Sequence, residues 1–297
     1  VKSYRSFRAL DGLDLQVPAG SIFGLVGSNG AGKTTSLIAA AGLVRIQSGS
    51  IDLLGEGAFL PERHRGRVSL LPQDAHAPAH TRLEDLLRYY GRLQGVPAAT
   101  LGRDIDRVLD MVHLSDRRRA KVRTLSHGMR RRLTIAQAFL GNPDMVLLDE
   151  PLNGLDPREV SNIRTILRER RGKQTLVVSS HLLTELEAVC DHVAIIEKGK
   201  LVRQDELHAF THNDRQLVYR LEPGDLPLDA LREALPGADL QHAFDGSSLT
   251  VKFSDDAYNL IGVNAIVLPL LLGAGSGVLE IQRGSDLEKE YLGSAQG

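Results

Sequence analysis

The segment from Ser21 to Thr34 constrains the fold of this chain more than any other. Residues 21–26 read SIFGLV, an apolar run typical of a buried strand, and a helix is expected over residues 32–41. Between them, residues 27–34 read GSNGAGKT and fit the pattern GxxxxGK(S/T). Glycines let such a loop fold so tightly that successive N–H groups face an anion, and the helix N-terminus adds its positive dipole end. The sequence therefore predicts a phosphate site between a strand and a helix.

The predicted site uses this loop and the first turn of the helix. Lys33 is expected to reach the β- and γ-phosphates of a nucleotide, and Thr34 is expected to hold Mg²⁺. A chance match to the pattern is expected on the order of 1% for a chain this long, before the strand–helix context is required. The residues predicted to bind the nucleotide are Gly27, Ser28, Asn29, Gly30, Ala31, Gly32, Lys33, Thr34 and Thr35.

A second apolar run ends in two carboxylates. Residues 145–150 read MVLLDE, which predicts a strand that carries Asp149 and Glu150 at its end. Asp149 is expected to organise Mg²⁺ through its water shell, while Glu150 is placed to polarise an attacking water as a general base. An acidic strand end taken alone is more often a solvated turn or a helix cap. The phosphate loop upstream favours the catalytic interpretation.

The first 200 residues alternate short β-branched runs with amphipathic stretches, which indicates helices packed on a mainly parallel sheet. Further strands are expected over residues 175–179 and 193–196, and apolar residues at i, i+3, i+4 and i+7 predict helices within residues 83–140. The predicted fold class is therefore α/β, with a helical subdomain over about residues 74–140.

The sequence pattern changes after residue 213, where prolines and glycines separate short predicted helices and strands. We therefore predict one domain over residues 1–213 and a smaller accessory domain over residues 214–297. The expected order strand 216–222, helix 228–235, strand 238–244, strand 247–253, helix 258–272 and strand 277–283 is βαββαβ, an α+β ferredoxin-like plan.

Residues 260–279 carry no charge over twenty positions, the length that a membrane-spanning helix requires. Asn264, Pro269 and a glycine-rich end leave about ten continuous apolar positions, which favours a buried core helix over a membrane span.

The charge balance and the cysteine content exclude some classes of protein. With 36 Lys+Arg against 37 Asp+Glu, no nucleic-acid partner is expected. The single Cys190 cannot pair within the chain, which excludes a disulfide-rich secreted protein and makes a reducing cytosolic compartment the default.

Residues 125–130 read LSHGMR. Together with the two motifs above, and over about residues 4–210, the sequence resembles the ATP-binding subunits of ABC transporters, whose signature loop most often reads LSGGQ. His127 here replaces a glycine and Met129 replaces a glutamine. The resemblance implies that Ser126 and Gly128 donate to the γ-phosphate of an ATP bound by the opposite subunit. Alone, Ser126 would be read as a plain helix N-cap.

Other motifs of that family follow in its order. Gln73 resembles the glutamine that touches Mg²⁺ or the attacking water, and Asp156 resembles the aspartate that contacts the partner subunit. His181, at the end of the expected strand 175–179, resembles the histidine that contacts the γ-phosphate. Tyr4 resembles the aromatic residue that stacks on adenine, with Phe7 as the alternative.

The resemblance implies an ATPase that uses ATP and Mg²⁺ and closes head to tail as a homodimer or heterodimer. It also implies a separately encoded integral membrane permease docked near Gln73 and the helical subdomain, and a peripheral position on the cytoplasmic face of the membrane. The segments LSHGMRRRL and GSDLEKEYL resemble multidrug, antibiotic-resistance or sodium-export systems. The accessory domain is expected to support dimerisation or to regulate it through a ligand.

The sequence fits two other functions less well. Soluble ABC ATPases of translation generally carry two cassettes, and those of chromosomes carry a long coiled coil before the signature, so one cassette with a short interval from Lys33 to Ser126 fits neither. A nucleotide kinase would lack the signature loop. The arginine runs 117–119 and 130–132 are interpreted as solvated helix faces, with a contribution to the permease dock as the alternative.

Overall fold

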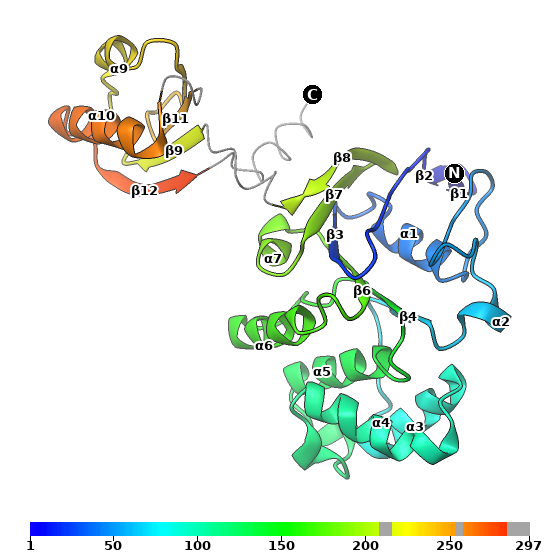
Figure 1. Cartoon of the computed structure of the whole chain (residues 1–297). Helices are drawn as coiled ribbons and strands as arrows, with labels where there is room; N and C mark the ends of the chain where they lie inside the picture. Colours follow the sequence, from blue (N-terminus) through cyan, green and yellow to red (C-terminus); the bar gives the residue numbers. More distant parts are fainter. Residues whose placement is uncertain (208–215, 254–257, 284–297) are drawn as a thin grey trace. The chain divides into compact units, whose positions relative to one another are not determined.

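The computed structural model describes residues 1–207, 216–253 and 258–283, which fall into two compact units, Val1–Asp205 and Glu206–Gly297 (Figure 1). The predicted boundary between residues 213 and 214 lies outside the described residues. The GSDLEKEYL segment, residues 284–292, also lies outside them.

A six-stranded sheet forms the centre of the first unit as far as it is described, with the strand order β4-β5-β6-β3-β7-β8. Its pairs β4–β5, β5–β6, β6–β3 and β3–β7 are all parallel, so the predicted α/β class with a mainly parallel sheet is confirmed. The strands are β3 (Ile22–Val26), β4 (Val68–Leu71), β5 (Met145–Leu148), β6 (Thr175–Ser180), β7 (His192–Glu197) and β8 (Lys200–Glu206).

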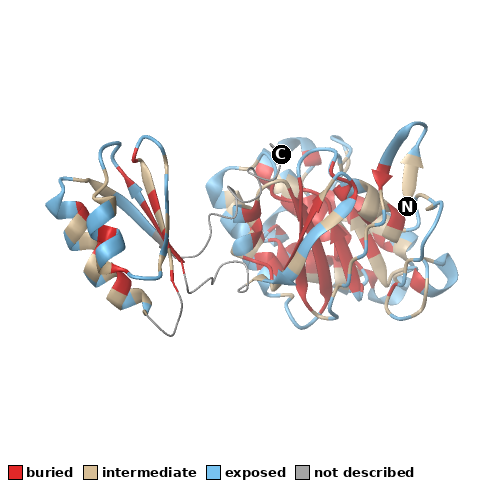
Figure 2. Ribbon diagram, turned by 90° about the horizontal axis from the view of Figure 1, so that it is seen from above, coloured by how far each residue is buried: buried red, intermediate tan, exposed pale blue. Residues whose placement is uncertain are grey.

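The central strands are buried along their whole length. Every residue of β3, β5 and β6 is buried, as expected where helices cover both faces of a parallel sheet (Figure 2). Apolar side chains of neighbouring strands meet in one cluster with Leu37 of the first helix, so the phosphate loop is anchored at both ends by the core. The helices joined to these strands are α1 (Lys33–Ala40), α2 (Pro61–His64), α6 (Pro157–Arg168) and α7 (Leu183–Glu187).

The helical subdomain contains α3 (Leu83–Gln94), α4 (Ala98–Met111) and α5 (His127–Ala138), which contact one another. Two short 3-10 helices, Ser115–Arg117 and Val122–Thr124, lie between α4 and α5. Helix α3 buries Leu83, Leu86 and Leu87, as its i, i+3, i+4 spacing predicts. Helix α5 also contacts β4, so the subdomain is tied to the edge of the sheet.

A hairpin of β1 (Lys2–Tyr4) and β2 (Phe7–Leu10) precedes the sheet, and its second strand ends against the phosphate loop. A Cβ atom at Gly32 would lie 2.7 Å from the carbonyl oxygen of Ala9, and Gly32 has a φ of +110°. Only glycine is free of both conflicts. The last glycine of the GxxxxGK motif is therefore required by packing as well as by the turn.

The described part of the second unit has the antiparallel strand order β10-β11-β9-β12. Its elements are β9 (Gln216–Leu221), α9 (Leu228–Ala234), β10 (Asp239–His242), β11 (Ser248–Lys252), α10 (Leu260–Gly273) and β12 (Val278–Arg283). This is the βαββαβ chain order of the ferredoxin-like fold predicted from the sequence.

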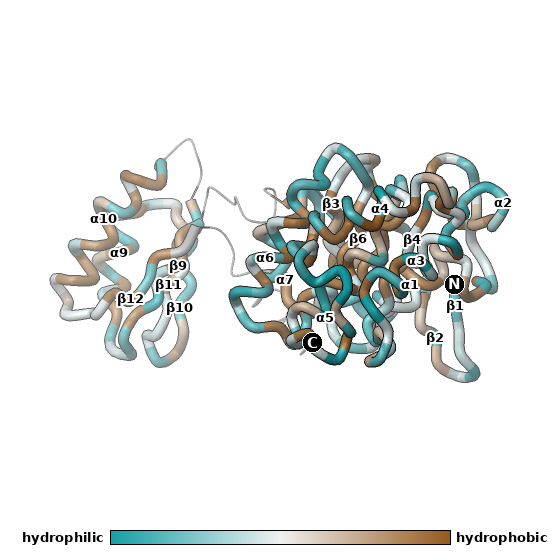
Figure 3. Tube along the Cα trace, turned by 90° about the horizontal axis from the view of Figure 1, so that it is seen from below, coloured by the Kyte–Doolittle hydropathy of each residue, from teal (hydrophilic) through white to brown (hydrophobic). Residues whose placement is uncertain are grey.

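Helix α10 contains most of the long uncharged segment, and it packs on the sheet of the second unit. Val263, Val267 and Leu271 point into the core, spaced so that they share one face of the helix. Other faces of α10 are apolar too, since Ile261 is 80% exposed, and Figure 3 shows hydrophobic segments along this helix. None of the helices in the described ranges is long and apolar enough to cross a membrane.

Candidate functional site

Four neighbouring strands of the sheet each end in one of the motifs found in the sequence. Strand β3 leads into the phosphate loop, β5 into Asp149 and Glu150, β6 into His181, and β4 into Gln73. The strands are parallel and in register, with Leu71 opposite Leu148 and Val26 opposite Ser180. All four motifs therefore lie at the same carboxyl edge, where open α/β sheets bind their ligands.

The phosphate loop is held by backbone hydrogen bonds. The Gly27 N–H donates to the carbonyl of Ser180 at 3.3 Å, and the Gly199 N–H donates to the carbonyl of Ala31 at 2.9 Å. A Cβ atom at Gly27 would lie 2.6 Å from the carbonyl oxygen of Ile196, so this position is also restricted to glycine. Residues 28–30 are exposed at the tip, and Thr35 is half-buried on the first turn of α1.

Lys33 lies at the centre of a buried polar cluster, with only 5% of its surface exposed. Its ammonium donates to the carbonyl of Gly27 at 2.6 Å and to that of Ser28 at 3.3 Å, and it is 3.1 Å from Glu150 Oε1. The other carboxylate oxygen of Glu150 lies 3.0 Å from Nδ1 of His181. The structure thus brings together three predicted residues, with a carboxylate between a cation and an imidazole.

A second chain of contacts runs beside the first. The Thr34 hydroxyl donates to Asp149 Oδ2 at 2.7 Å, and the Ser179 hydroxyl donates to Asp149 Oδ1 at 2.6 Å. The Ser179 oxygen also accepts the N–H of Glu150 at 2.8 Å. Ser179 is fully buried, and it orients both carboxylate residues. We predicted no role for it, although it lies two residues before His181, at the end of the strand next to β5.

Thr34 and Asp149 offer a hydroxyl and a carboxylate oxygen, the hard donors that Mg²⁺ prefers. Mg²⁺ is usually held in such sites by one or two protein groups together with phosphates and water. The described residues contain no cluster of three or more His, Cys, Asp or Glu side chains that could hold a metal by themselves. The donor set therefore fits a magnesium ion that arrives with a nucleotide.

Gln73 is brought to the same edge but not into the cluster. It is exposed, and its backbone carbonyl accepts a hydrogen bond from Arg131 at 3.3 Å. Within the described ranges, its side chain makes no hydrogen bond to Thr34, Asp149 or Glu150.

Ser126 of the signature loop and Asp156 are both helix caps in this chain. Ser126 caps α5 by accepting the N–H of Met129 at 3.1 Å, and Asp156 caps α6 by accepting the N–H groups of Arg158 and Glu159, each at 3.0 Å. No hydrogen bond or ion pair of the described chain joins Ser126 or Asp156 to the phosphate loop. Both side chains are exposed, so they remain accessible to another molecule.

Gly128 is buried between two helices. A Cβ atom there would lie 2.4 Å from Cγ of Glu159 on α6, so a larger residue at this position would have to displace the Glu159 side chain. Glu159 in turn is held by an ion pair with Arg132 at 3.0 Å.

Tyr4 and Phe7 pair across the turn of the first hairpin and are 41% and 58% exposed. The Lys2 ammonium lies 4.8 Å from the centre of the Tyr4 ring. The hairpin reaches the phosphate loop at Gly32, as described above, while both aromatic rings remain open to solvent.

The interpretation of residues 130–132 as a solvated helix face is wrong for two of the three arginines. Arg130 is exposed, whereas Arg132 is only 7% exposed and donates to the carbonyl of Val112 at 2.9 Å. Arg131 is half-buried, and its guanidinium points at the ends of β4 and β5. Sequence spacing could not distinguish them, because α5 is buried against the sheet and against α6 at the same time.

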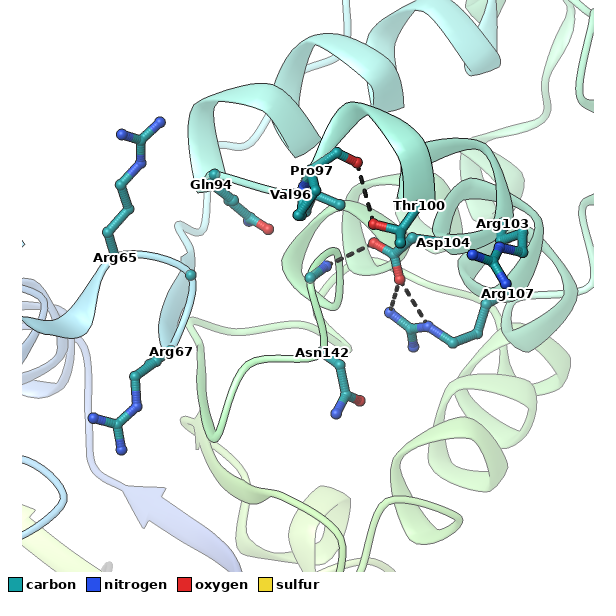
Figure 4. A pocket seen from close by; sticks show the side chains of 13 residues that line it. Arg65, Arg67, Gln94, Val96, Pro97, Thr100, Arg103, Asp104, Arg107 and Asn142 are labelled. Atoms are coloured by element: carbon teal, nitrogen blue, oxygen red, sulfur yellow. Dashed lines mark hydrogen bonds and ion pairs between the residues drawn. The ribbon is translucent and has the colours of Figure 1, made fainter.

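A separate cavity of about 590 Å³ lies where α4, the turn before it and residues 65–67 and 141–142 meet (Figure 4). Figure 4 shows Asp104 in contact with Arg107, and Asp104 also accepts the N–H of Gly141 at 2.7 Å. None of the predicted nucleotide-binding residues lines this cavity. It is therefore distinct from the site at the carboxyl edge.

The chain was compared with proteins of known family. The family model described as "ABC transporter" matches residues 10–153. A Nod factor export ATP-binding protein I of Cupriavidus metallidurans is 32% identical over 98% of this chain and 93% of its own length. An uncharacterised ABC transporter ATP-binding protein of Bacillus subtilis is 37% identical over 68% of this chain and 67% of its own length.

Solved structures agree with the sequence comparison. The ATP-binding subunit of an ABC transporter, 27% identical, superimposes with a TM-score of 0.61 and covers 70% of this chain and 87% of its own. A nucleotide-free ATP-binding cassette that is 21% identical shares the fold, with the same TM-score. The relatives found are ABC transporter subunits, so nothing favours the soluble alternative. From its motifs, its fold and these relatives, we conclude that the chain belongs to the ATP-binding subunits of ABC transporters, a family that binds and hydrolyses ATP.

Proposed function

We propose that this chain hydrolyses ATP to drive export through a separately encoded integral membrane permease. The observation that carries the proposal is the meeting of Lys33, Asp149, Glu150 and His181 at one edge of the sheet. Export as the direction is supported by the relatives named for Nod factor export.

In this proposal Glu150 is the general base. Its carboxylate is buried and ion-paired with Lys33, so it has little contact with solvent before nucleotide binds. Phosphate oxygens compete for the Lys33 ammonium, which leaves Glu150 free to accept a proton from the attacking water. His181 holds the second carboxylate oxygen and contributes to the γ-phosphate site. Thr34 and Asp149 would hold Mg²⁺, and Gln73 would touch the metal or the attacking water.

When bound there, Mg²⁺ would neutralise negative charge on the phosphates. Thr34 would offer its hydroxyl to the ion, and Asp149 would hold it through water. Ser179 keeps the Asp149 carboxylate in place from the opposite side, which fits a metal site with a preset orientation.

The proposed working unit is a dimer of cassettes, either homodimeric or heterodimeric. Ser126, Gly128 and Asp156 of one chain would contact the nucleotide and the phosphate loop of the other. This assignment is supported by the exposure of Ser126 and Asp156 and by the lack of bonds from them to the phosphate loop in the described part of this chain. Tyr4 would stack on adenine, with Phe7 as the alternative.

The proposed location is the cytoplasmic face of the membrane, with the permease docked near Gln73 and the helical subdomain. Residues 74–140 form this subdomain within a cassette of residues 1–213. Residues 214–297 form the accessory domain, which we propose supports or regulates dimerisation. No nucleic-acid partner is expected, because acidic and basic residues are balanced.

The proposal is tested with the Glu150→Gln variant. It should bind ATP, stall before hydrolysis and form a dimer in Mg-ATP, measured by light scattering. A Glu150→Gln, Lys33→Ala double variant serves as the control and should remain monomeric, because it lacks the cation that holds the phosphates. Normal turnover by Glu150→Gln would refute the general-base role.

The transport part needs a second measurement. The tagged protein should retain a multi-span membrane protein when it is purified from native membranes in detergent. An ATP-dependent dimer without such a partner would agree with the ATPase assignment and would contradict the proposal that the chain works with a permease.

A further inference from the structure

The guanidinium group of Arg131 joins α5, the helix that begins at the signature loop and is called the signature helix here, to the loops that follow β4 and β5. It lies on α5, and its Nη2 donates to the carbonyl of Glu150 at 2.6 Å and to that of Asp149 at 3.4 Å. Its Nε donates to the carbonyl of Pro151 at 2.9 Å, and its Nη1 to that of Gln73 at 3.3 Å. Three consecutive carbonyls after β5 and one after β4 therefore accept hydrogen bonds from one guanidinium group.

The Arg131 guanidinium remains charged although its surroundings lower its pKa. Burial lowers the pKa of the Arg131 guanidinium, while the carboxylates of Asp149, Asp74 and Glu150 raise it. An arginine begins from a pKa so high that it remains protonated in proteins. Its hydrogen bonds to the carbonyls are therefore charge-assisted, which makes them stronger than bonds between neutral groups.

The backbone that Arg131 holds is not in a relaxed conformation. Glu150 has a φ of +47°, a left-handed conformation that is unfavourable for a residue with a side chain. Its N–H is held by Ser179, and its carbonyl by Arg131. The two contacts grip the same residue from both sides, so the direction of the Glu150 side chain depends on both.

Arg131 lies five residues after Ser126, the cap of α5, which is about 7.5 Å along a helix axis. A helix transmits movement over this distance as a rigid rod. We propose that Arg131 is a positioning residue that makes the orientation of the Glu150 carboxylate depend on the position of the signature helix. The inference rests on the proposed role of Glu150 as the general base.

Lysine cannot substitute for arginine in this role. The planar guanidinium offers five N–H donors in a fixed fork, whereas an ammonium is a single point at the end of a flexible chain. Lysine keeps the charge but loses the simultaneous contacts to the loops after β4 and β5. Glutamine keeps a planar donor group and loses the charge.

The first test compares Arg131→Lys and Arg131→Gln with Arg130→Gln in the full chain. Arg130 is exposed and donates to the carbonyl of Leu125 at the start of its own helix, so it is a matched control on the same turn. Both Arg131 variants should lower kcat by about 10- to 100-fold, because small displacements of a catalytic group have effects of this size. KM for ATP should stay within about twofold, since Lys33 and the phosphate loop are unchanged. Arg130→Gln should match the parent.

The second test is a double-mutant cycle with Glu150→Gln, measured as single-turnover hydrolysis with protein in excess. If Arg131 acts through Glu150, Arg131→Lys should change the residual rate of Glu150→Gln by less than about threefold. Circular dichroism melting of each variant checks that it is folded, and Arg131→Gln replaces Arg131→Lys if the latter is not.

Each outcome decides a different point. A loss of the same factor in both backgrounds, or a rise in KM with kcat unchanged, would overturn the positioning role. Normal kcat for Arg131→Lys together with a stalled Glu150→Gln would also overturn it and leave the proposed function intact. Normal kcat for Glu150→Gln itself would instead refute the general base, independently of Arg131.

Discussion

Replacing Ser179 by alanine tests whether one buried hydroxyl orients both carboxylate residues. The change removes only a hydroxyl group, yet its O–H donates to Asp149 Oδ1 at 2.6 Å and its oxygen accepts the N–H of Glu150 at 2.8 Å. Ser179 has no exposed surface, so water has no direct route to the two groups that lose their partner. We expect Ser179→Ala to lower both the free energy of unfolding of the cassette and the rate of ATP hydrolysis.

The magnitude follows from the two hydrogen bonds. A hydrogen bond to a charged group contributes about 1.5–3 kcal/mol, and a buried N–H left without a partner costs about 1–3 kcal/mol. Both contributions depend on the same oxygen atom and are not fully additive. We therefore expect the free energy of unfolding to fall by about 2–4 kcal/mol. With its N–H released, Glu150 can leave its left-handed conformation. We therefore expect kcat to fall by about tenfold, as for other displaced catalytic groups.

Urea unfolding followed by circular dichroism measures the first effect, and steady-state hydrolysis measures the second. The two units of the chain can unfold in separate transitions, so the comparison is restricted to the transition that the substitution shifts. Ser36→Ala is the matched control, because within the described residues the Ser36 hydroxyl bonds only to the carbonyl of Lys33 in its own helix, at 2.7 Å. It should change the free energy of unfolding by less than about 0.5 kcal/mol. Equal midpoints and equal kcat for the two variants would refute the reasoning.

Three further predictions concern other parts of the molecule. Burial raises the pKa of the Cys190 thiol, so a thiol reagent at pH 8 should react with it only after unfolding; rapid reaction of the folded protein would contradict its burial. Hydrogen bonds from Arg118 and Arg88 hold the pKa of Glu84 below its ordinary value of 4.5, so the stability that they provide is complete above this pH and is lost as the pH falls below it. Urea midpoints of the parent and Glu84→Gln should accordingly differ at pH 7 and converge in acid, and a constant difference would exclude this linkage. Gly128→Ala places a methyl group 2.4 Å from Glu159 and should lower the melting temperature by several degrees, whereas an unchanged melting temperature would show that α6 yields without strain.

Much of the candidate site could be predicted because its residues lie at the ends of short apolar strands. The parallel strands at residues 22–26, 145–148 and 175–180 are buried along their whole length and mostly apolar, so the polar residues at their ends stand out in the sequence. Once the strands are parallel neighbours, Lys33, Asp149 and His181 must meet at one edge. The order of the elements in the second unit was predicted for the same reason, since glycines and prolines mark the turns between them.

The contacts that connect these motifs could not be predicted, because they depend on packing between distant segments. Ser179 and Arg131 resemble ordinary polar residues in the sequence, and Arg130 to Arg132 differ only in which neighbour each one meets. The sequence by itself determined which chemical groups the site contains, since residue type and strand periodicity are local properties. The tertiary structure decided how the Glu150 carboxylate is held, because hydrogen bonds from α5 and β6 form only when helix, sheet and loops are packed together.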